Sequence, residues 1–335
     1  MNYIDAGLIA LANIILNFIF IRFSHIYNLL DYPNYRKKHI KPTPYTGGIV
    51  LSISYLIIVY ITDYDDLENM ILSFGFLISL AGFLDDKIHL DPGTKIILQF
   101  IIIILVVEKG LLLTNLGVYN SFPYISFGSL SEIFTIMCCL LIINSYNYND
   151  GIDGVAISIF IIIFCAFYFY LKLLGINKLN SFIIFLLICN FISLIFNLSL
   201  FKFPKIFIGN SGSNLNGFII AFFSIYLFTQ QNINPALIIW PLSFLVFEFI
   251  SINLNRILMK KKLFASGFDH IHYDLKSKLR LNNFKVLITI SLINVYFCTI
   301  GWFVFKNLGA DFSIFLFILH FFIYLIFKLK LTKYK

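Results

Sequence analysis

The chain has 335 residues, of which 59 % are hydrophobic and 13 % charged, and its mean hydropathy is +0.88. This composition lies far outside the range of soluble globular domains and is typical of membrane proteins. The formal net charge is +8; with so few charged residues, we expect the bilayer and no nucleic acid as a partner.

Apolar runs recur along the whole sequence. A transmembrane helix needs roughly 20 mainly apolar residues. About eleven runs meet or approach this length: 6–21, 46–62, 67–84, 95–107, 130–146, 153–171, 180–199, 215–229, 234–252, 284–305 and 309–327. The sequence therefore predicts an all-α, polytopic membrane protein with about eleven transmembrane helices. We expect it to form a single domain over residues 1–335.

The basic residues sort to one side of this predicted topology. With eleven spans, 21 of the 25 Lys and Arg residues fall on the side that holds the C-terminus. Because cytoplasmic loops are enriched in Lys and Arg, we expect the C-terminus inside and the N-terminus outside. The predicted location is the inner (plasma) membrane. The cytoplasmic loops are then 22–45, 85–95, 144–153, 200–214 and 253–283.

The first of these loops contains the segment DYPNYRKKHIKPTPYTGG, residues 31–48. Its prolines favour an irregular backbone, and its closing glycine pair permits close approach of a ligand or another backbone. Arg36, His39 and Lys41 are candidates for binding phosphate. The alternative is an anchor for anionic lipid head groups.

Two adjacent carboxylates, Asp85 and Asp86, stand at the cytoplasmic end of the third apolar run. Such a pair repels itself near hydrocarbon and favours a cation or a proton. Mg²⁺ is usually held by one or two carboxylates, water and substrate phosphates. A magnesium site is therefore predicted here, with a solvated pair as the alternative.

The densest polar cluster is NSYNYNDGIDGVA, residues 144–156. Asp150 and Asp153 would share one face if the next helix began in this segment. Asn144 and Asn147 precede them, and the glycines keep backbone amides open to a ligand. This cluster is predicted to meet the two aspartates of the preceding paragraph at the same membrane surface.

Further polar segments fall on the predicted cytoplasmic face. The turn around Ser211 and Gly212 offers backbone N–H groups to an anion, although such turns are ordinary loop chemistry. Glu248 is a carboxylate inside a predicted span, a position that is usually functional. His270 and His272 form a His-x-His pair that suits phosphate or nucleotide contacts or a metal.

Taken together, these blocks resemble the polyprenyl-phosphate N-acetylhexosamine-1-phosphate transferases. The resemblance covers nearly the whole chain and is carried by residues 31–48, GFLDDK (82–87), residues 144–156, FIGNSGSNLNGF (207–218) and the HIH of 270–272. It implies an enzyme that moves a sugar-1-phosphate from a UDP-sugar to undecaprenyl phosphate, releases UMP and starts a cell-surface glycan. A homodimer is compatible with this resemblance.

The resemblance also implies roles for individual residues. Mg²⁺, or Mn²⁺ in its place, is the expected cofactor. The implied metal ligands are Asp85, Asp86 and Asn210; the catalytic carboxylates are Asp85, Asp86, Asp150 and Asp153; and the substrate-binding residues are Arg36, His39, Lys41, Asn144, Asn147, Ser211, Gly212, His270 and His272.

The sequence departs from the family pattern in its second half. Asn210 stands where the family has a metal-binding Asp, and the histidine motif lacks its arginine and its last histidine. An amide oxygen can still bind Mg²⁺ but brings no charge, so a lower metal affinity is expected. Two alternatives therefore stay open: a catalytically impaired relative, and a membrane transporter or flippase. A transporter is less consistent with the sequence, which shows no inverted repeat.

Overall fold

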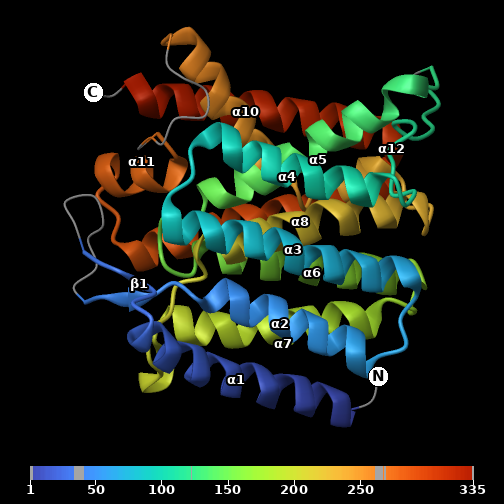
Figure 1. The fold of residues 1–335 in the computed structure, drawn as a ribbon. Coiled ribbons are helices and arrows are strands. Elements are labelled where there is room, and N and C mark those ends of the chain that lie inside the picture. Colours follow the sequence, from blue (N-terminus) through green and yellow to red (C-terminus); the bar gives the residue numbers. More distant parts are fainter. Residues whose placement is uncertain (1–2, 34–40, 122, 261–266, 268, 334–335) are drawn as a thin grey trace.

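The computed structural model of the protein describes residues 3–33, 41–121, 123–260, 267 and 269–333 (Figure 1). Over these residues the fold is mainly helical, which confirms the all-α prediction. A small antiparallel ladder pairs Leu30 with Pro44 and Asp31 with Thr43. The elements are α1 (Tyr3–Ile26), β1 (Leu30–Asp31), β2 (Thr43–Pro44), α2 (Gly47–Ile61), α3 (Asp66–Ile88), α4 (Pro92–Val107), α5 (Ser131–Tyr148), α6 (Val155–Leu173), α7 (Asn180–Asn197), α8 (Gly209–Thr229), α9 (Pro235–Ile238), α10 (Ser243–Leu258), α11 (Ile271–Lys278) and α12 (Asn283–Lys333), with short 3-10 helices at Gly128–Leu130 and Leu200–Lys202.

Seven helices in the described part of the chain are long and apolar enough to cross a membrane: α1, α3, α5, α6, α7, α8 and α12. The apolar helices α2 and α4 are shorter, with 15 and 16 residues. The protein is thus a multi-pass membrane protein. The exact number of crossings and the side of each terminus stay predictions.

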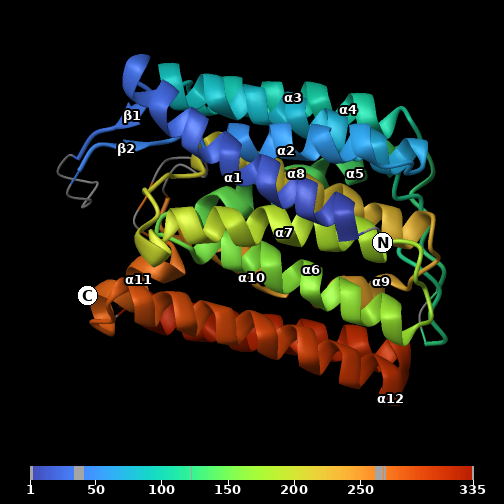
Figure 2. The same cartoon turned by 90° about the horizontal axis from the view of Figure 1, so that it is seen from below.

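Helix α12 is a helical hairpin. Gly309 adopts φ +83°, a left-handed conformation that glycine reaches without a steric penalty. The two parts run antiparallel, since Tyr296 Oη in the first lies 2.9 Å from His320 Nε2 in the second. The predicted runs 284–305 and 309–327 are the two arms of this hairpin. The C-terminus consequently lies at the end of the bundle opposite to the N-terminus (Figures 1 and 2).

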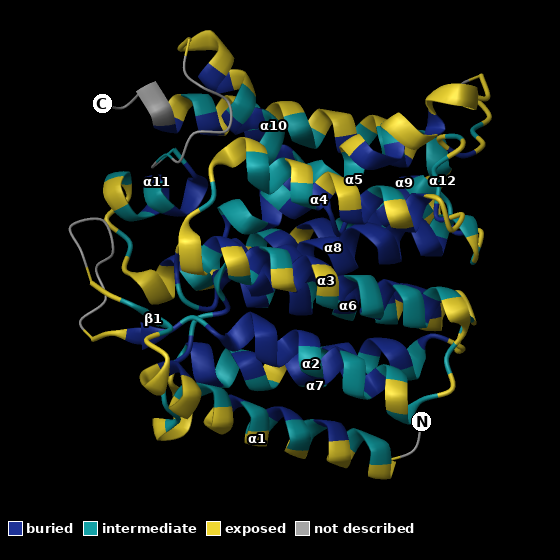
Figure 3. Ribbon diagram, viewed as in Figure 1, coloured by how far each residue is buried: buried dark blue, intermediate teal, exposed yellow. Residues whose placement is uncertain are grey.

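Helix α8 occupies the centre of the bundle (Figure 3). In its apolar stretch 89 % of the residues are buried, against 17 % in α1 and 22 % in α12. Small residues let neighbouring helices approach it closely, as is common in membrane proteins. A Cβ on Gly48 of α2 would lie 2.0 Å from Gly212 N, and one on Gly82 of α3 would lie 2.4 Å from Asn210 O. These contacts fix the first turn of α8 against the ends of α2 and α3.

Hydrogen bonds between side chains cross the apolar core. Asn190 of α7 donates to Tyr55 Oη at 2.7 Å, and Asn216 of α8 donates to Asn190 Oδ1 at 2.9 Å and to Tyr146 Oη at 3.2 Å. Because no water reaches hydrocarbon, buried polar groups must find partners within the protein. The network joins α2, α5, α7 and α8 and keeps the bundle in one register.

Candidate functional site

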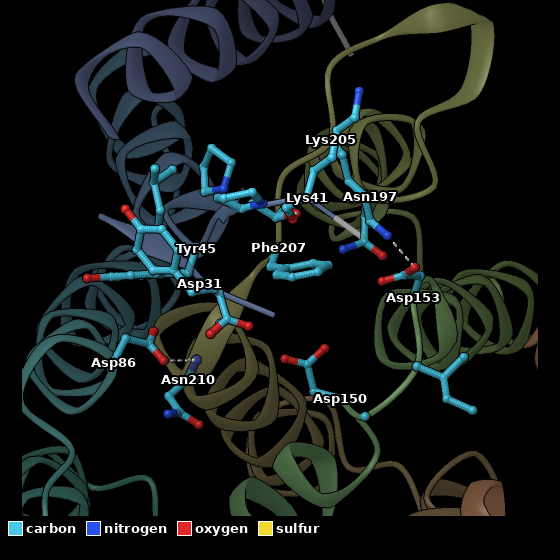
Figure 4. A pocket seen from close by; sticks show the side chains of 18 of the residues that line it. Asp31, Lys41, Tyr45, Asp86, Asp150, Asp153, Asn197, Lys205, Phe207 and Asn210 are labelled. Carbon is cyan, nitrogen blue, oxygen red and sulfur yellow. Dashed lines mark hydrogen bonds and ion pairs between the residues drawn. The ribbon is translucent and has the colours of Figure 1, made fainter. Parts of the chain in front are cut away.

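A polar cavity of about 1920 Å³ opens at the end of the bundle that holds β1, β2 and α11 (Figure 4). Several segments line it, among them the β1–β2 ladder, the end of α3, the turn between α5 and α6, the start of α8, and α11. The lining includes Asp31, Lys41, Tyr45, Asp86, Asp150, Asp153, Lys205, Phe207, Asn210 and Tyr273. Segments that are far apart in the sequence thus meet around one space.

Asp86 faces this cavity and also caps α8. Its Oδ1 accepts a hydrogen bond from Asn210 N at 3.0 Å, and its Oδ2 accepts one from Ser211 N at 3.1 Å. A carboxylate at a helix N-terminus is favoured by the helix dipole. Gly209 has φ +64°, and a Cβ there would lie 2.5 Å from Asp86 Oδ2. Glycine is therefore required for this contact, which holds the Asp86 carboxylate in a fixed position.

Asp85 lies on a different side of α3 from Asp86. It is buried, pairs with Lys95 Nζ of α4 at 2.7 Å and accepts a hydrogen bond from Leu90 N at 3.0 Å. Asp85 does not appear in the lining of the polar cavity. The expectation that both aspartates face one metal does not match this arrangement, because successive helical residues point about 100° apart.

The turn Asp150–Gly154 brings two more carboxylates to the cavity. The structure starts α6 at Val155, within the segment 144–156, and both aspartates lie in the turn just before the helix. Asp153 pairs with Lys205 Nζ at 2.5 Å, whose ammonium also lies 5.1 Å from the Phe207 ring centre. Among the described residues, no hydrogen bond or ion pair reaches the Asp150 carboxylate.

The electrostatic setting of Asp150 is unusual. Burial, followed by the negative charges of Asp86 and Asp153, raises the pKa of Asp150 well above its ordinary value. Both neighbours are carboxylates of the same cavity, and the cavity-facing position of Asp150 is plain in Figure 4. A bound proton or a cation would each relieve this accumulation of negative charge.

The side-chain amides of Asn144 and Asn147 lie behind the cavity and connect the helices that surround it. Asn147 donates from Nδ2 to Asn210 Oδ1 at 2.9 Å and to Ser213 Oγ at 2.6 Å. It thereby ties the end of α5 to the start of α8. Asn144 lies one turn deeper and donates to Gln99 Oε1 at 3.0 Å, away from the cavity lining. Asn147 is thus a support for Asn210, and Asn144 a contact between helices.

Ser211 and Gly212 act through their backbone. Ser211 is buried, its Oγ donates to Ile208 O at 3.0 Å, and its N–H is the Asp86 contact already described. Gly212 packs against Gly48 of α2. Neither residue appears in the cavity lining. Lys41 does line the cavity, whereas Arg36 and His39 lie outside the described residues.

The two histidines lie behind the cavity wall. His270 is 7 % exposed and His272 is fully buried, and their rings stack with centroids 5.6 Å apart. A Cβ on Gly151 would lie 2.3 Å from His272 Nε2, so His272 packs directly on the turn Asp150–Gly154. Burial lowers the pKa of both rings. Both rings are enclosed by the protein and neither lines the cavity, so a phosphate contact by them stays a prediction.

Helix α11 presents other residues to the cavity: Tyr273, Lys276 and Ser277. Their spacing of three and four residues places them on one helical face. They could not be predicted from the sequence, because the recognisable motif of this segment is the His-x-His pair at the start of the helix. Sequence reasoning also missed Asp31, whose carboxylate points into the cavity (Figure 4). An acid inside a strongly basic loop was the available signal.

An arginine from another helix stands beside the histidine motif. Arg256 of α10 is buried, and its Nε and Nη2 donate to the two Asp269 oxygens at 2.7 and 2.8 Å. Its guanidinium also lies 5.9 Å from the Tyr148 ring centre. The motif thus has a guanidinium neighbour even though its own sequence lacks the expected arginine.

The cavity holds several oxygen atoms that a divalent cation could use as ligands. No group of three or more His, Cys, Asp or Glu that could hold a metal occurs in the part of the chain that the structure describes. Asp86, Asp150 and Asn210 nevertheless line one cavity, and the side-chain atoms with which they could bind a cation are all oxygens. Because Mg²⁺ takes few protein oxygens and completes its shell with water and phosphate, these residues fit Mg²⁺.

The fold and the cavity define a multi-pass, all-α membrane protein with a site at one end of its helix bundle that is lined by both aspartates and lysines. Residues 68–228 match the sequence profile described as glycosyl transferase family 4. This match agrees with the family resemblance that the sequence motifs indicate.

Curated relatives support the same resemblance. The chain is 27 % identical to the undecaprenyl-phosphate alpha-N-acetylglucosaminyl 1-phosphate transferase of Yersinia pestis, over 73 % of this chain and 68 % of the relative. A relative of the same name from Haemophilus influenzae is 28 % identical over 82 % of this chain and 78 % of its own length. A probable undecaprenyl-phosphate N-acetylglucosaminyl 1-phosphate transferase of Bacillus subtilis is 27 % identical over 73 % of this chain and 69 % of its own length.

Proposed function

We propose that the protein transfers a sugar-1-phosphate from a UDP-sugar to polyprenyl phosphate, with release of UMP. The sugar is an N-acetylhexosamine and the product starts a cell-surface glycan. The names of the relatives support the reaction class. The observation that carries the proposal is the meeting of Asp86, Asp150 and Asn210 with Lys41 and Lys205 around one cavity at a bundle end.

In the proposed topology the chain crosses the inner membrane eleven times, with the N-terminus outside. The cavity then opens on the cytoplasmic face, where nucleotide-sugars occur. The cavity end of the bundle also holds the C-terminus (Figure 1). This end carries the predicted basic loops, which supports the orientation by the positive-inside rule.

The bond changes follow from the two substrates. An oxygen of the lipid phosphate attacks the β-phosphorus of the UDP-sugar and forms a new P–O bond. The bond from that phosphorus to the bridging oxygen breaks, and UMP leaves with this oxygen. Phosphoryl transfer depends mainly on positioning and on neutralising charge. The site must therefore hold two phosphorylated molecules together.

The residues of the cavity meet these needs in different ways. Asp86, Asp150 and Asn210 would hold Mg²⁺, which when bound supplies positive charge to phosphate oxygens. Lys41, Lys205 and Lys276 of the cavity lining can neutralise the diphosphate. Asp86 is fixed by two backbone N–H groups, so its position needs little reorganisation during the reaction.

The test is release of labelled UMP by the purified protein given undecaprenyl phosphate and a panel of UDP-sugars with Mg²⁺. Turnover with one UDP-N-acetylhexosamine is expected, together with its loss in Asp150→Asn. Asp63→Asn changes an exposed acid between α2 and α3 and should retain full turnover. No UMP from any donor would overturn the proposal in favour of an impaired relative or a transporter.

A further inference from the structure

A buried ionic network joins the C-terminal arm of α12 to α10 and α11. Glu248 of α10 and Lys328 of α12 are both fully buried. Lys328 Nζ lies 3.3 Å from Glu248 Oε1 and 3.1 Å from Asp274 Oδ2 of α11. Lys278 Nζ, one turn further along α11, lies 3.1 Å from Asp274 Oδ1. Two acids and two bases are thus balanced within the protein.

Glu248 also holds the first turn of α11. Its Oε1 accepts a hydrogen bond from Ile271 N at 2.6 Å, and its Oε2 accepts one from Tyr324 Oη at 2.6 Å. The residue at the N-cap, His270, makes no side-chain capping bond. A helix needs its first N–H groups satisfied. Here a carboxylate from another helix supplies one of the missing acceptors.

The far end of α11 is tied to α12 as well. Lys278 Nζ donates to Leu331 O, so α11 contacts α12 at both Lys328 and Leu331. Helix α11 has only eight residues. A helix this short is not stable by itself in water. Its position therefore depends on these contacts with α10 and α12.

The opposite side of α11 forms part of the candidate site. His272 packs on Gly151 in the turn that carries Asp150, while Tyr273, Lys276 and Ser277 line the cavity. A displacement of α11 would move this lining and loosen the turn together. The buried charges of Glu248 and Lys328 are thereby connected to the cavity through one short helix.

We propose that Glu248 and Lys328 are positioning residues, which hold α11 so that its Tyr273–Lys276–Ser277 face forms the substrate-facing wall of the cavity. The proposal rests on the proposed transferase function for its kinetic readout. Neither residue touches the reacting atoms; both act through α11. The last arm of α12 is consequently part of the working site, although it lies outside the matched family region of residues 68–228.

The primary test is Lys328→Met, which keeps the length of the side chain and leaves Glu248 without its cation. Removing one member of a buried ion pair leaves an uncompensated charge, and small displacements of a site can lower kcat/KM about 100-fold. We expect a higher KM for the UDP-sugar, because α11 lines the cavity, together with a lower kcat, because His272 packs on the turn that carries Asp150. Lys330→Met, an exposed neighbour on the same arm, should change neither constant.

A paired variant separates positioning from general destabilisation. Glu248→Gln with Lys328→Met removes both charges, keeps an oxygen acceptor for Ile271 N, and leaves Asp274 paired with Lys278. It should recover most of the kcat/KM that is lost in Lys328→Met. A double variant as impaired as the single one would contradict the proposal, since the uncompensated charge would then not be the cause.

Hydrogen exchange measured by mass spectrometry gives a readout that needs no activity. Residues 271–278 should lose protection in Lys328→Met, keep it in Lys330→Met and regain it in the double variant. Equal exchange of this segment in the wild type and Lys328→Met would overturn the proposal. If the wild type releases no UMP, the transferase function fails, and the exchange measurement still decides whether Lys328 positions α11.

Discussion

Asp85 and Asp86 are adjacent in the sequence, but their carboxylates contact different helices. Asp86 caps α8 and faces the polar cavity, whereas Asp85 is buried against Lys95 of α4. One residue can therefore serve the chemistry while the other fastens α3 to α4. The division suggests different consequences for the two substitutions.

Substitution of the cavity carboxylates should affect turnover, and substitution of Asp85 should affect stability. Asp150→Asn is expected to lower kcat/KM at least about 1000-fold, because the site loses a charge directed at the phosphates. Asp85→Asn leaves Lys95 unpaired; since that lysine is 39 % exposed, the cost in folding free energy should be about 1 kcal/mol. Thermal unfolding and UMP release measured on the same samples distinguish the two effects.

The double variant Asp85→Asn with Lys95→Met is the control for this assignment. It removes the ion pair without leaving a single charge, so turnover and stability should both approach the wild type. Complete loss of turnover in a well-folded double variant would show that Asp85 takes part in the reaction, as the sequence alone suggested.

The glycine contact between α2 and α8 should be intolerant of any side chain. A Cβ on Gly48 would lie 2.0 Å from Gly212 N and 2.3 Å from Ser211 Oγ, and the first of these is a backbone atom that cannot rotate away. We expect Gly48→Ala to lower the free energy of unfolding by at least about 2 kcal/mol. The midpoint of thermal unfolding in detergent reports the change.

Gly7→Ala is the matched control, because nothing lies within 4 Å of a Cβ at this position of α1. Its unfolding midpoint should stay equal to that of the wild type or rise slightly, since alanine favours a helix. Equal effects of the two substitutions would mean that the close packing of α2 on α8 does not limit stability.

Much of the fold follows from the sequence, because hydrophobic runs of bilayer length leave few alternatives to helices. The polar blocks at 31–48, 82–87 and 144–156 also follow from it, since charged groups in such a chain gather at helix ends. The direction in which each side chain points does not follow from the sequence. It depends on where a helix ends and which neighbour packs there, as the separation of Asp85 from Asp86 shows.

Contacts between distant segments were likewise beyond sequence reasoning. The His-x-His pair matched a familiar pattern, yet its rings are enclosed and the following turn of α11 lines the cavity. Glu248 could be recognised as an intramembrane acid, but its partner Lys328 follows 80 residues later. Only the fold of α12 into a hairpin brings that lysine back to α10.

Asn210 offers a test of the proposed metal site. Its side chain lines the cavity with Asp86 and Asp150, and its Oδ1 already accepts a hydrogen bond from Asn147. Asn210→Asp adds a third negative charge to the donor set, so we expect about a tenfold gain in Mg²⁺ affinity, equal to roughly 1.4 kcal/mol. Thermal unfolding followed across a Mg²⁺ titration measures this affinity without turnover.

Asn115→Asp controls for the added charge, because this residue lies in the loop between α4 and α5. It keeps the side-chain oxygen that accepts a hydrogen bond from Gly117 N. The Mg²⁺ dependence of thermal unfolding should therefore stay unchanged. An Asn210→Asp protein with the Mg²⁺ affinity of the wild type would indicate that residue 210 does not contact the metal.

The packing of His272 on the turn Asp150–Gly154 should weaken at acidic pH. Burial, with smaller contributions from His270, Lys328 and Lys276, lowers the pKa of His272 well below the ordinary value of 6.5. The folded state therefore binds fewer protons than the unfolded state below pH 6.5. Stability from the buried neutral ring is complete above that pH and declines as the pH falls, by up to about 1.4 kcal/mol per pH unit for one proton.

The measurement is hydrogen exchange of residues 271–278 between pH 7.5 and 5.5, corrected for the intrinsic pH dependence of exchange. Protection should fall toward the acidic end in the wild type. His272→Gln, which carries no titrating ring, should lose much of this dependence, with the remainder due to His270, whose pKa burial also lowers. His25→Gln replaces an exposed histidine of α1 and should retain it. A pH dependence unchanged in His272→Gln would show that protonation of this ring does not control the contact between α11 and the turn.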